Sequence, residues 1–171
     1  VHLYAEKWHT RVDVFDIVAF DYGLDESMEY AFERAVGEEP LRIISRVITE
    51  DFPWSEIVTA DWTMSNEILG SIWPLDYTEA QTGWQVSHYT DGRPTAGVLS
   101  TNGLWWRYTT TSSNMNRGRA ATISRLLLCE DYLDRPVAFS EADTSETTTA
   151  DAAQEDPYCL ACHASLDPVA A

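Results

Sequence analysis

The sequence predicts a mainly α protein: a small helical scaffold with long loops, followed by a short C-terminal segment with chemistry of its own. Three observations predict this class. Apolar residues recur at helical spacing over residues 13–52 and again over 116–129. Turn-forming pairs of glycine, proline, asparagine and aspartate concentrate between residues 75 and 108. Residues 140–156 combine threonine, serine and acidic residues with no basic side chain, the composition of a solvated linker.

The first half of the chain is predicted to form a helical hairpin. It is preceded by an apolar run interrupted by acids, residues 13–20. A helix is expected over 24–36, with Gly37 as its stop signal, because its apolar residues share one face. That face holds Met28, Ala31, Phe32, Ala35 and Val36. A second apolar helix is expected over 40–52, since proline suits a first helical turn.

Shorter elements follow in order. A third helix is expected to start at Ser55, and a fourth to cover 63–69, with Thr63 as its N-cap. The turn pairs predict loops over 75–108, with at most a short hairpin. Helical spacing returns over 116–129.

These elements predict four parts of the chain. Residues 1–75 form a helical scaffold, and 76–139 form a loop-rich part that ends in a helix. Residues 140–156 are an acidic, threonine-rich linker, which delivers the C-terminal segment 157–171.

The charge of the chain restricts its partners. Eleven basic and 28 acidic residues give a net charge of −17, so nucleic acid and anionic membrane surfaces are poor partners. A basic partner protein would be attracted, although acidity that only keeps a protein soluble explains the charge equally well. No apolar run reaches the roughly 18 residues of a transmembrane helix.

The most specific motif is Cys159-Leu160-Ala161-Cys162-His163. Two thiols at this spacing can each add to one vinyl group of a haem, and the adjacent imidazole can ligate the iron. The sequence therefore predicts one covalently bound haem c. The alternatives are a disulfide, a thiol redox pair or half of a zinc site. Zinc needs a second ligand pair, whereas the remaining cysteine, Cys129, stands alone and is expected to be inert packing or to pair with another chain.

The second iron ligand is predicted to be Met115, because a thioether with a histidine gives a stable, relatively high-potential haem. Met115 lies in a polar loop, although a packing role at a helix start is an equal alternative. Met28 and Met64 are expected in the core. His88 is the runner-up, with a solvated loop histidine as the ordinary alternative.

Two more pairs of residues are candidates for contact with the cofactor. Arg117 and Arg119 open a helix and could hold the haem propionates, or could merely balance acidic neighbours. Trp105 and Trp106 could pack on the porphyrin, although a tryptophan pair more often forms core.

Several segments together resemble the planctomycete-type cytochrome c proteins, large secreted proteins built from domains of unknown function. The resemblance covers about residues 37–168, and its most specific part is CxxCHxxLDP. The segments that carry it are Ile57–Glu67, Ala96–Thr101, Asn116–Gly118, Leu127–Cys129 and Cys159–Pro168. The chain departs from the family in two ways. The acidic tract replaces a proline-rich stretch, and the continuation after Leu166-Asp167-Pro168 is absent, so we expect a fragment of a longer protein.

The resemblance implies a haem-bearing domain outside the cytoplasm, in the periplasm or at the bacterial cell surface. Three hypotheses remain. The first is an electron-transfer cytochrome domain, whose partner is another redox protein or a subunit of a larger complex. The second is an enzyme, either a haem peroxidase or the haem relay of a secreted oxidoreductase. The third is a structural or interaction module of a surface assembly.

Overall fold

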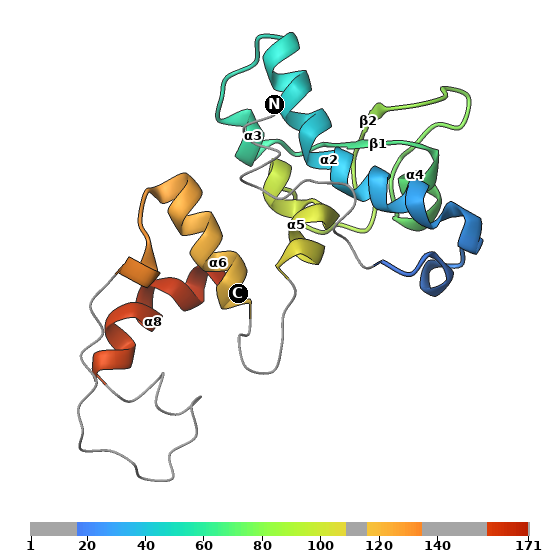
Figure 1. Ribbon diagram of the computed structural model, residues 1–171. Coiled ribbons are helices and arrows are strands. Elements are labelled where there is room, and N and C mark those ends of the chain that lie inside the picture. Colours follow the sequence, from blue (N-terminus) through green and yellow to red (C-terminus); the bar gives the residue numbers. More distant parts are fainter. Residues whose placement is uncertain (1–16, 109–115, 135–156, 171) are drawn as a thin grey trace. The chain divides into compact units, whose positions relative to one another are not determined.

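The computed structural model describes residues 17–108, 116–134 and 157–170 (Figure 1). The described chain is mainly helical with one small sheet, which confirms the predicted fold class. It divides into two compact units, residues 1–107 and 108–171, so the predicted segment 76–139 contributes to both. The linker predicted over 140–156 lies outside the described residues.

Unit 1 is built on one long helix, α2 (Glu29–Thr49). The predicted hairpin is wrong, because α2 runs unbroken through Gly37 and Pro40. A proline inside a helix costs about 3 kcal/mol through its lost hydrogen bond and its ring. Apolar residues on both sides of the proline offset this cost, since they fall on one buried face. They are Phe32, Ala35, Val36, Ile43, Ile44 and Val47.

The helix α5 (Asn102–Arg107) packs closely on α2 beside the proline. A Cβ added to Gly103 would lie 2.9 Å from the carbonyl oxygen of Val36 and 3.7 Å from Cδ of Pro40. That carbonyl is the one whose helical N–H partner the proline removes. Glycine is therefore required at position 103 by the close approach of the two backbones. The predicted loop at Asn102-Gly103 is wrong, because these residues begin a helix.

The predicted fourth helix is wrong at its start. Residues Thr63–Ser65 form the strand β1, and the helix α4 (Glu67–Ile72) begins only after Asn66. The side chain of Asn66 accepts a hydrogen bond from the backbone N–H of Leu69 at 3.1 Å and is the true N-cap. Strand β1 pairs antiparallel with β2 (Gln85–Ser87), so the sheet joins segments on either side of α4 and is not a hairpin.

The remaining elements of unit 1 are short. They are the 3-10 turns η1 (Ala19–Tyr22), η2 (Glu26–Met28) and η3 (Gly97–Ser100), and the helix α3 (Glu56–Thr59), which follows Ser55 as predicted. Aromatic rings close the core at one end: the ring of Tyr22 meets those of Phe32, Trp73 and Trp106 edge-on, with centroids 5.2, 5.3 and 5.9 Å apart.

Unit 2 is a pair of helices. The helix α6 (Arg117–Ile123) continues as a π-helical turn, η4 (Ser124–Leu128), and confirms the helix predicted over 116–129. The short turn η5 (Tyr132–Asp134) follows, and α8 (Pro157–Ala170) packs against α6 (Figure 1). The helices share a small core of Ala120, Tyr132, Leu166 and Ala170, with Ala121, Cys162 and Val169 at its edge.

Candidate functional site

The CxxCH motif lies within α8 (Pro157–Ala170). Proline at the first helical position is favourable, because its missing N–H has no partner there in any case. With about 3.6 residues per turn, Cys159, Cys162 and His163 fall on one side of the helix within a little more than one turn. Both cysteines are partly exposed free thiols. The helix therefore presents two thiols and an imidazole together.

The second half of α8 anchors the motif to the rest of unit 2. Leu166 and Ala170 are buried in the core. The Tyr132 hydroxyl donates to Oγ of Ser165 at 2.9 Å, and the amide of Asn116 donates to the carbonyl oxygen of Ala170 at 3.1 Å. Cys162 packs at the edge of this core. A group bonded to Cys162 would therefore begin beside a fixed apolar surface.

His163 is held by a charged network across the two helices. Its Nδ1 lies 3.0 Å from Oδ1 of Asp167, one turn further along α8. Arg117, at the start of α6, binds the same carboxylate: its Nε donates to Oδ1 at 2.8 Å and its Nη2 donates to Oδ2 at 3.1 Å. The hydrogen bond from Arg117, helped by that from His163, lowers the pKa of Asp167 to about 2. Asp167 is thus ionised at neutral pH.

The donor set of this site fits covalent haem attachment. Both thiols are free, and His163 makes no hydrogen bond through Nε2 to any described residue, so that nitrogen is available to a metal. In the described ranges, no group of three or more histidine, cysteine or acidic side chains is arranged to bind a metal ion. Among the described residues of unit 2, His163 is the histidine beside the two thiols and is the candidate iron ligand.

Asp167 was not predicted from the sequence, although its signal was present. Asp167 follows His163 by four residues, the spacing at which helical side chains meet. Arg117, predicted to hold propionates, is engaged with Asp167 instead of standing apart. Arg119 is buried, with 6 % of its surface exposed, and donates through Nη2 to the carbonyl oxygen of Tyr108 at 3.1 Å. Propionate binding by either arginine stays a prediction.

The tryptophan candidates lie on α5 in unit 1. Trp106 packs against the unit 1 core, which is the core alternative that the sequence favoured. Trp105 is 49 % exposed. Cys129 in unit 2 is exposed and adopts a left-handed backbone with φ of 57°, so its expected role as inert buried packing is wrong.

The two iron-ligand candidates fare differently. Met115 lies outside the described residues. His88 is half-exposed in unit 1, where its Nδ1 lies 3.2 Å from Oδ2 of Asp76. Met64 is buried, as expected of a core residue, and Met28 is partly buried. The structure therefore brings Cys159, Cys162, His163 and Arg117 together and leaves the second iron ligand a prediction.

A second polar cluster, in unit 1, was also missed. The carboxylate of Glu39 is fully buried on the apolar face of α2, where Oε1 accepts from the Thr63 hydroxyl at 2.7 Å and Oε2 from the Asn102 backbone N–H at 3.1 Å. Burial, only partly opposed by these hydrogen bonds, raises its pKa to about 7. The signal was its position, since residue 39 continues the helical spacing of the apolar residues 32, 35, 36 and 43.

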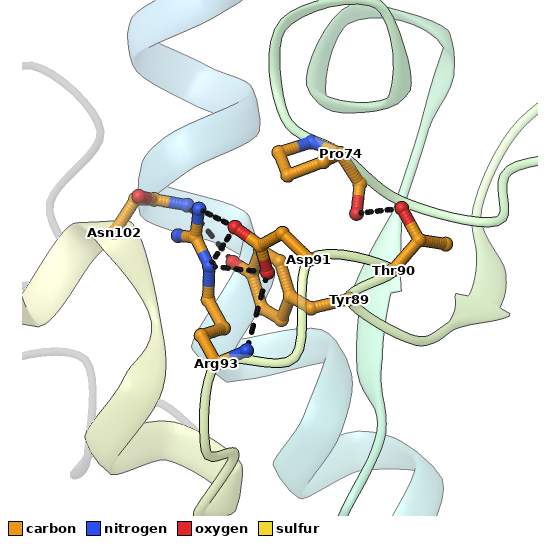
Figure 2. Close-up of polar contacts among 6 residues, drawn as sticks. All are labelled: Pro74, Tyr89, Thr90, Asp91, Arg93 and Asn102. Atoms are coloured by element: carbon orange, nitrogen blue, oxygen red, sulfur yellow. Dashed lines mark hydrogen bonds and ion pairs between the residues drawn. The ribbon is translucent and has the colours of Figure 1, made fainter.

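The side chain of Tyr89 lies beside those of Asp91, Arg93 and Asn102, and Asn102 is also the residue whose backbone N–H binds Glu39 (Figure 2). The guanidinium of Arg93 lies 4.5 Å from the centre of the Tyr89 ring and is paired with the carboxylate of Asp91. The amide of Asn102 donates to the Tyr89 hydroxyl at 3.4 Å. Every polar group named here has a partner. The cluster therefore links α2, β1 and α5 by hydrogen bonds.

Comparison of the chain with models of protein families, with curated proteins and with solved structures found no match. The resemblance to planctomycete-type cytochrome c proteins therefore rests on the motif residues alone and stays a prediction. In the parts of the chain that the structure describes, no helix has the length and apolar character needed to cross a membrane.

Proposed function

We propose that this chain is a c-type cytochrome domain that carries one covalently bound haem and transfers electrons, as part of a larger secreted protein or assembly. One observation carries the proposal: Cys159, Cys162 and His163 share one side of α8, and the Nδ1 of His163 is engaged by Asp167. This arrangement would leave the other ring nitrogen, Nε2, to ligate a metal.

The two thiols of α8 are what this chain would contribute to covalent attachment. Cys159 and Cys162 would each hold the haem through a thioether, formed by adding S–H across a vinyl C=C bond with no leaving group. No oxidant or reductant is consumed, so free thiols are the required starting state, and Cys159 and Cys162 are both free. When bound, the haem would supply a one-electron couple, and His163 would supply one nitrogen ligand to its iron.

Met115 is proposed as the second iron ligand, with His88 as the runner-up. A methionine would give a higher potential than a second histidine. Arg117, Arg119, Trp105 and Trp106 remain proposed cofactor contacts. Arg117 also holds Asp167.

The charge of the chain supports a basic redox partner. A net charge of −17 attracts a cationic surface and accelerates encounter at low salt. The same negative charge favours the more positive, oxidised state of a haem and so lowers its reduction potential. Because covalent haem attachment takes place outside the cytoplasm in the family that the chain resembles, a periplasmic or cell-surface location is proposed.

The test is to express the full chain in a host with haem-attachment machinery and to record reduced-minus-oxidised and pyridine haemochrome spectra. Wild type should show a covalent c-type spectrum at one haem per chain. Cys159→Ala with Cys162→Ala should abolish covalent attachment, whereas Cys129→Ser, a matched change of the third thiol in the same unit, should leave it intact. A wild-type chain without haem and with a Cys159–Cys162 disulfide would support the structural-module alternative instead.

A further inference from the structure

The network around Asp167 has a role that the attachment motif alone does not require. We propose that Asp167, held in place by Arg117, is a positioning residue that fixes the ring and the tautomer of His163 and thereby sets how strongly this histidine binds a metal. The inference rests on the proposed function, since the metal concerned is haem iron.

The geometry defines a chain of three side chains. Oδ1 of Asp167 is shared, since it accepts from Nε of Arg117 at 2.8 Å and faces Nδ1 of His163 at 3.0 Å. Arg117 contacts the second oxygen as well, at 3.1 Å, so the carboxylate is held at two points. The paired groups are partly shielded: the side chains of His163 and Arg117 are each 23 % exposed, and that of Asp167 is 39 % exposed.

This arrangement determines where the proton of a neutral His163 resides. An ionised carboxylate can only accept hydrogen bonds, so Nδ1 must carry the hydrogen. Nε2 then keeps its lone pair, which is the form that binds a metal. The contact also joins α8 to α6, because Arg117 begins α6, so the ring is fixed relative to both helices of unit 2.

The carboxylate also increases the electron donation of the imidazole. A histidine ligand that donates its other N–H to a carboxylate becomes more basic, which favours ferric over ferrous iron. Arg117 limits this effect by neutralising part of the charge of Asp167. Loss of the carboxylate should therefore raise the reduction potential of the bound haem.

Two substitutions separate the hydrogen bond from the charge. Asp167→Asn keeps an oxygen at the shared position and removes the charge, whereas Asp167→Leu removes both. Asp131→Asn is the matched control, because Asp131 lies in the same unit and pairs with Arg125, at 4.0 Å. Any general effect of removing one acidic charge from unit 2 should appear in the control as well.

The first readout uses the full chain made without haem. Nitrogen-15 NMR at a pH where His163 is neutral should find mainly the Nδ1–H tautomer in wild type, in Asp167→Asn and in Asp131→Asn. Asp167→Leu should revert to mainly Nε2–H, the preference of a free imidazole. A wild-type chain with mainly Nε2–H would overturn the inference.

The second readout uses the haem-loaded chain. At a fixed solution potential, Asp167→Leu should raise the ferrous-to-ferric ratio at least tenfold over wild type, which corresponds to 59 mV for one electron. Asp167→Asn should move it in the same direction, and Asp131→Asn much less. Equal shifts of the ferrous-to-ferric ratio in all three variants would mean that only the lost negative charge matters. That result would overturn the positioning role of Asp167. Absence of haem from wild type would overturn the proposed function, and this inference with it, whatever the tautomer.

Discussion

The buried carboxyl of Glu39 should make the stability of unit 1 depend on pH in an unusual direction. Glu39 is fully buried, and burial raises its pKa from the ordinary 4.5 to about 7. Between these two values the unfolded chain releases the proton while the folded chain keeps it. The folded state then binds more protons than the unfolded state, so the free energy of unfolding falls as pH rises through this window.

The size of the effect follows from the two pKa values. One pKa unit corresponds to about 1.4 kcal/mol, so the full difference amounts to about 3 kcal/mol, of which about 2 to 3 kcal/mol should be lost between pH 5 and pH 8. Glu39→Gln cannot ionise and should abolish this loss. Its amide can still donate to Thr63 and accept from Asn102, because the Thr63 hydroxyl can reverse its role from donor to acceptor.

Urea unfolding followed by circular dichroism at several pH values between 5 and 8 provides the assay. Glu39→Gln should be the more stable protein at pH 8 and lose its advantage at pH 5. The control is Glu38→Gln, which changes the neighbouring, only partly buried residue that pairs with Arg34 and Arg42. There burial raises the pKa, but the hydrogen bonds from both arginines outweigh it, so this variant should not gain stability at pH 8. Parallel pH profiles for wild type and Glu39→Gln would refute the reasoning.

Three further predictions concern single side chains. Gly103→Ala should destabilise unit 1 in urea unfolding, because its Cβ would lie 2.9 Å from the Val36 carbonyl oxygen; Gly118→Ala, with open space around its Cβ, should instead stabilise its helix by up to about 1 kcal/mol. Asn66→Ala removes the N-cap of α4 and should lower the unfolding free energy by about 1 kcal/mol; no change would contradict the cap. Met115→Ala should convert a low-spin haem spectrum to high-spin, and an unchanged spectrum would exclude this methionine as the iron ligand.

The sequence predicted the helical character of the chain better than the limits of its helices. Apolar spacing located both halves of α2, but Gly37 and Pro40 led to the prediction of two separate helices. The helix continues because α5 packs at that point and apolar residues on both sides of Pro40 face one core, a long-range effect that local signals do not contain. Thr63 similarly resembles an N-cap, yet its hydroxyl is used by Glu39, 24 residues earlier.

The candidate site was predictable to a similar degree. The motif identified Cys159, Cys162 and His163, because two thiols at this spacing can reach the two vinyl groups of one haem. The helix α8 that presents them was not predicted. Asp167 could have been found from its spacing to His163. The partnership with Arg117 could not, since it depends on how α6 packs against α8, 50 residues apart in the chain.

The covalent haem is the central claim, and the intact mass of the denatured full chain tests it most directly. After expression with haem-attachment machinery, the account predicts a wild-type chain heavier by one haem, and no such addition when Cys159 and Cys162 are both alanine. A wild-type mass equal to that of the bare polypeptide, or lower by the two hydrogens of a disulfide, would contradict it.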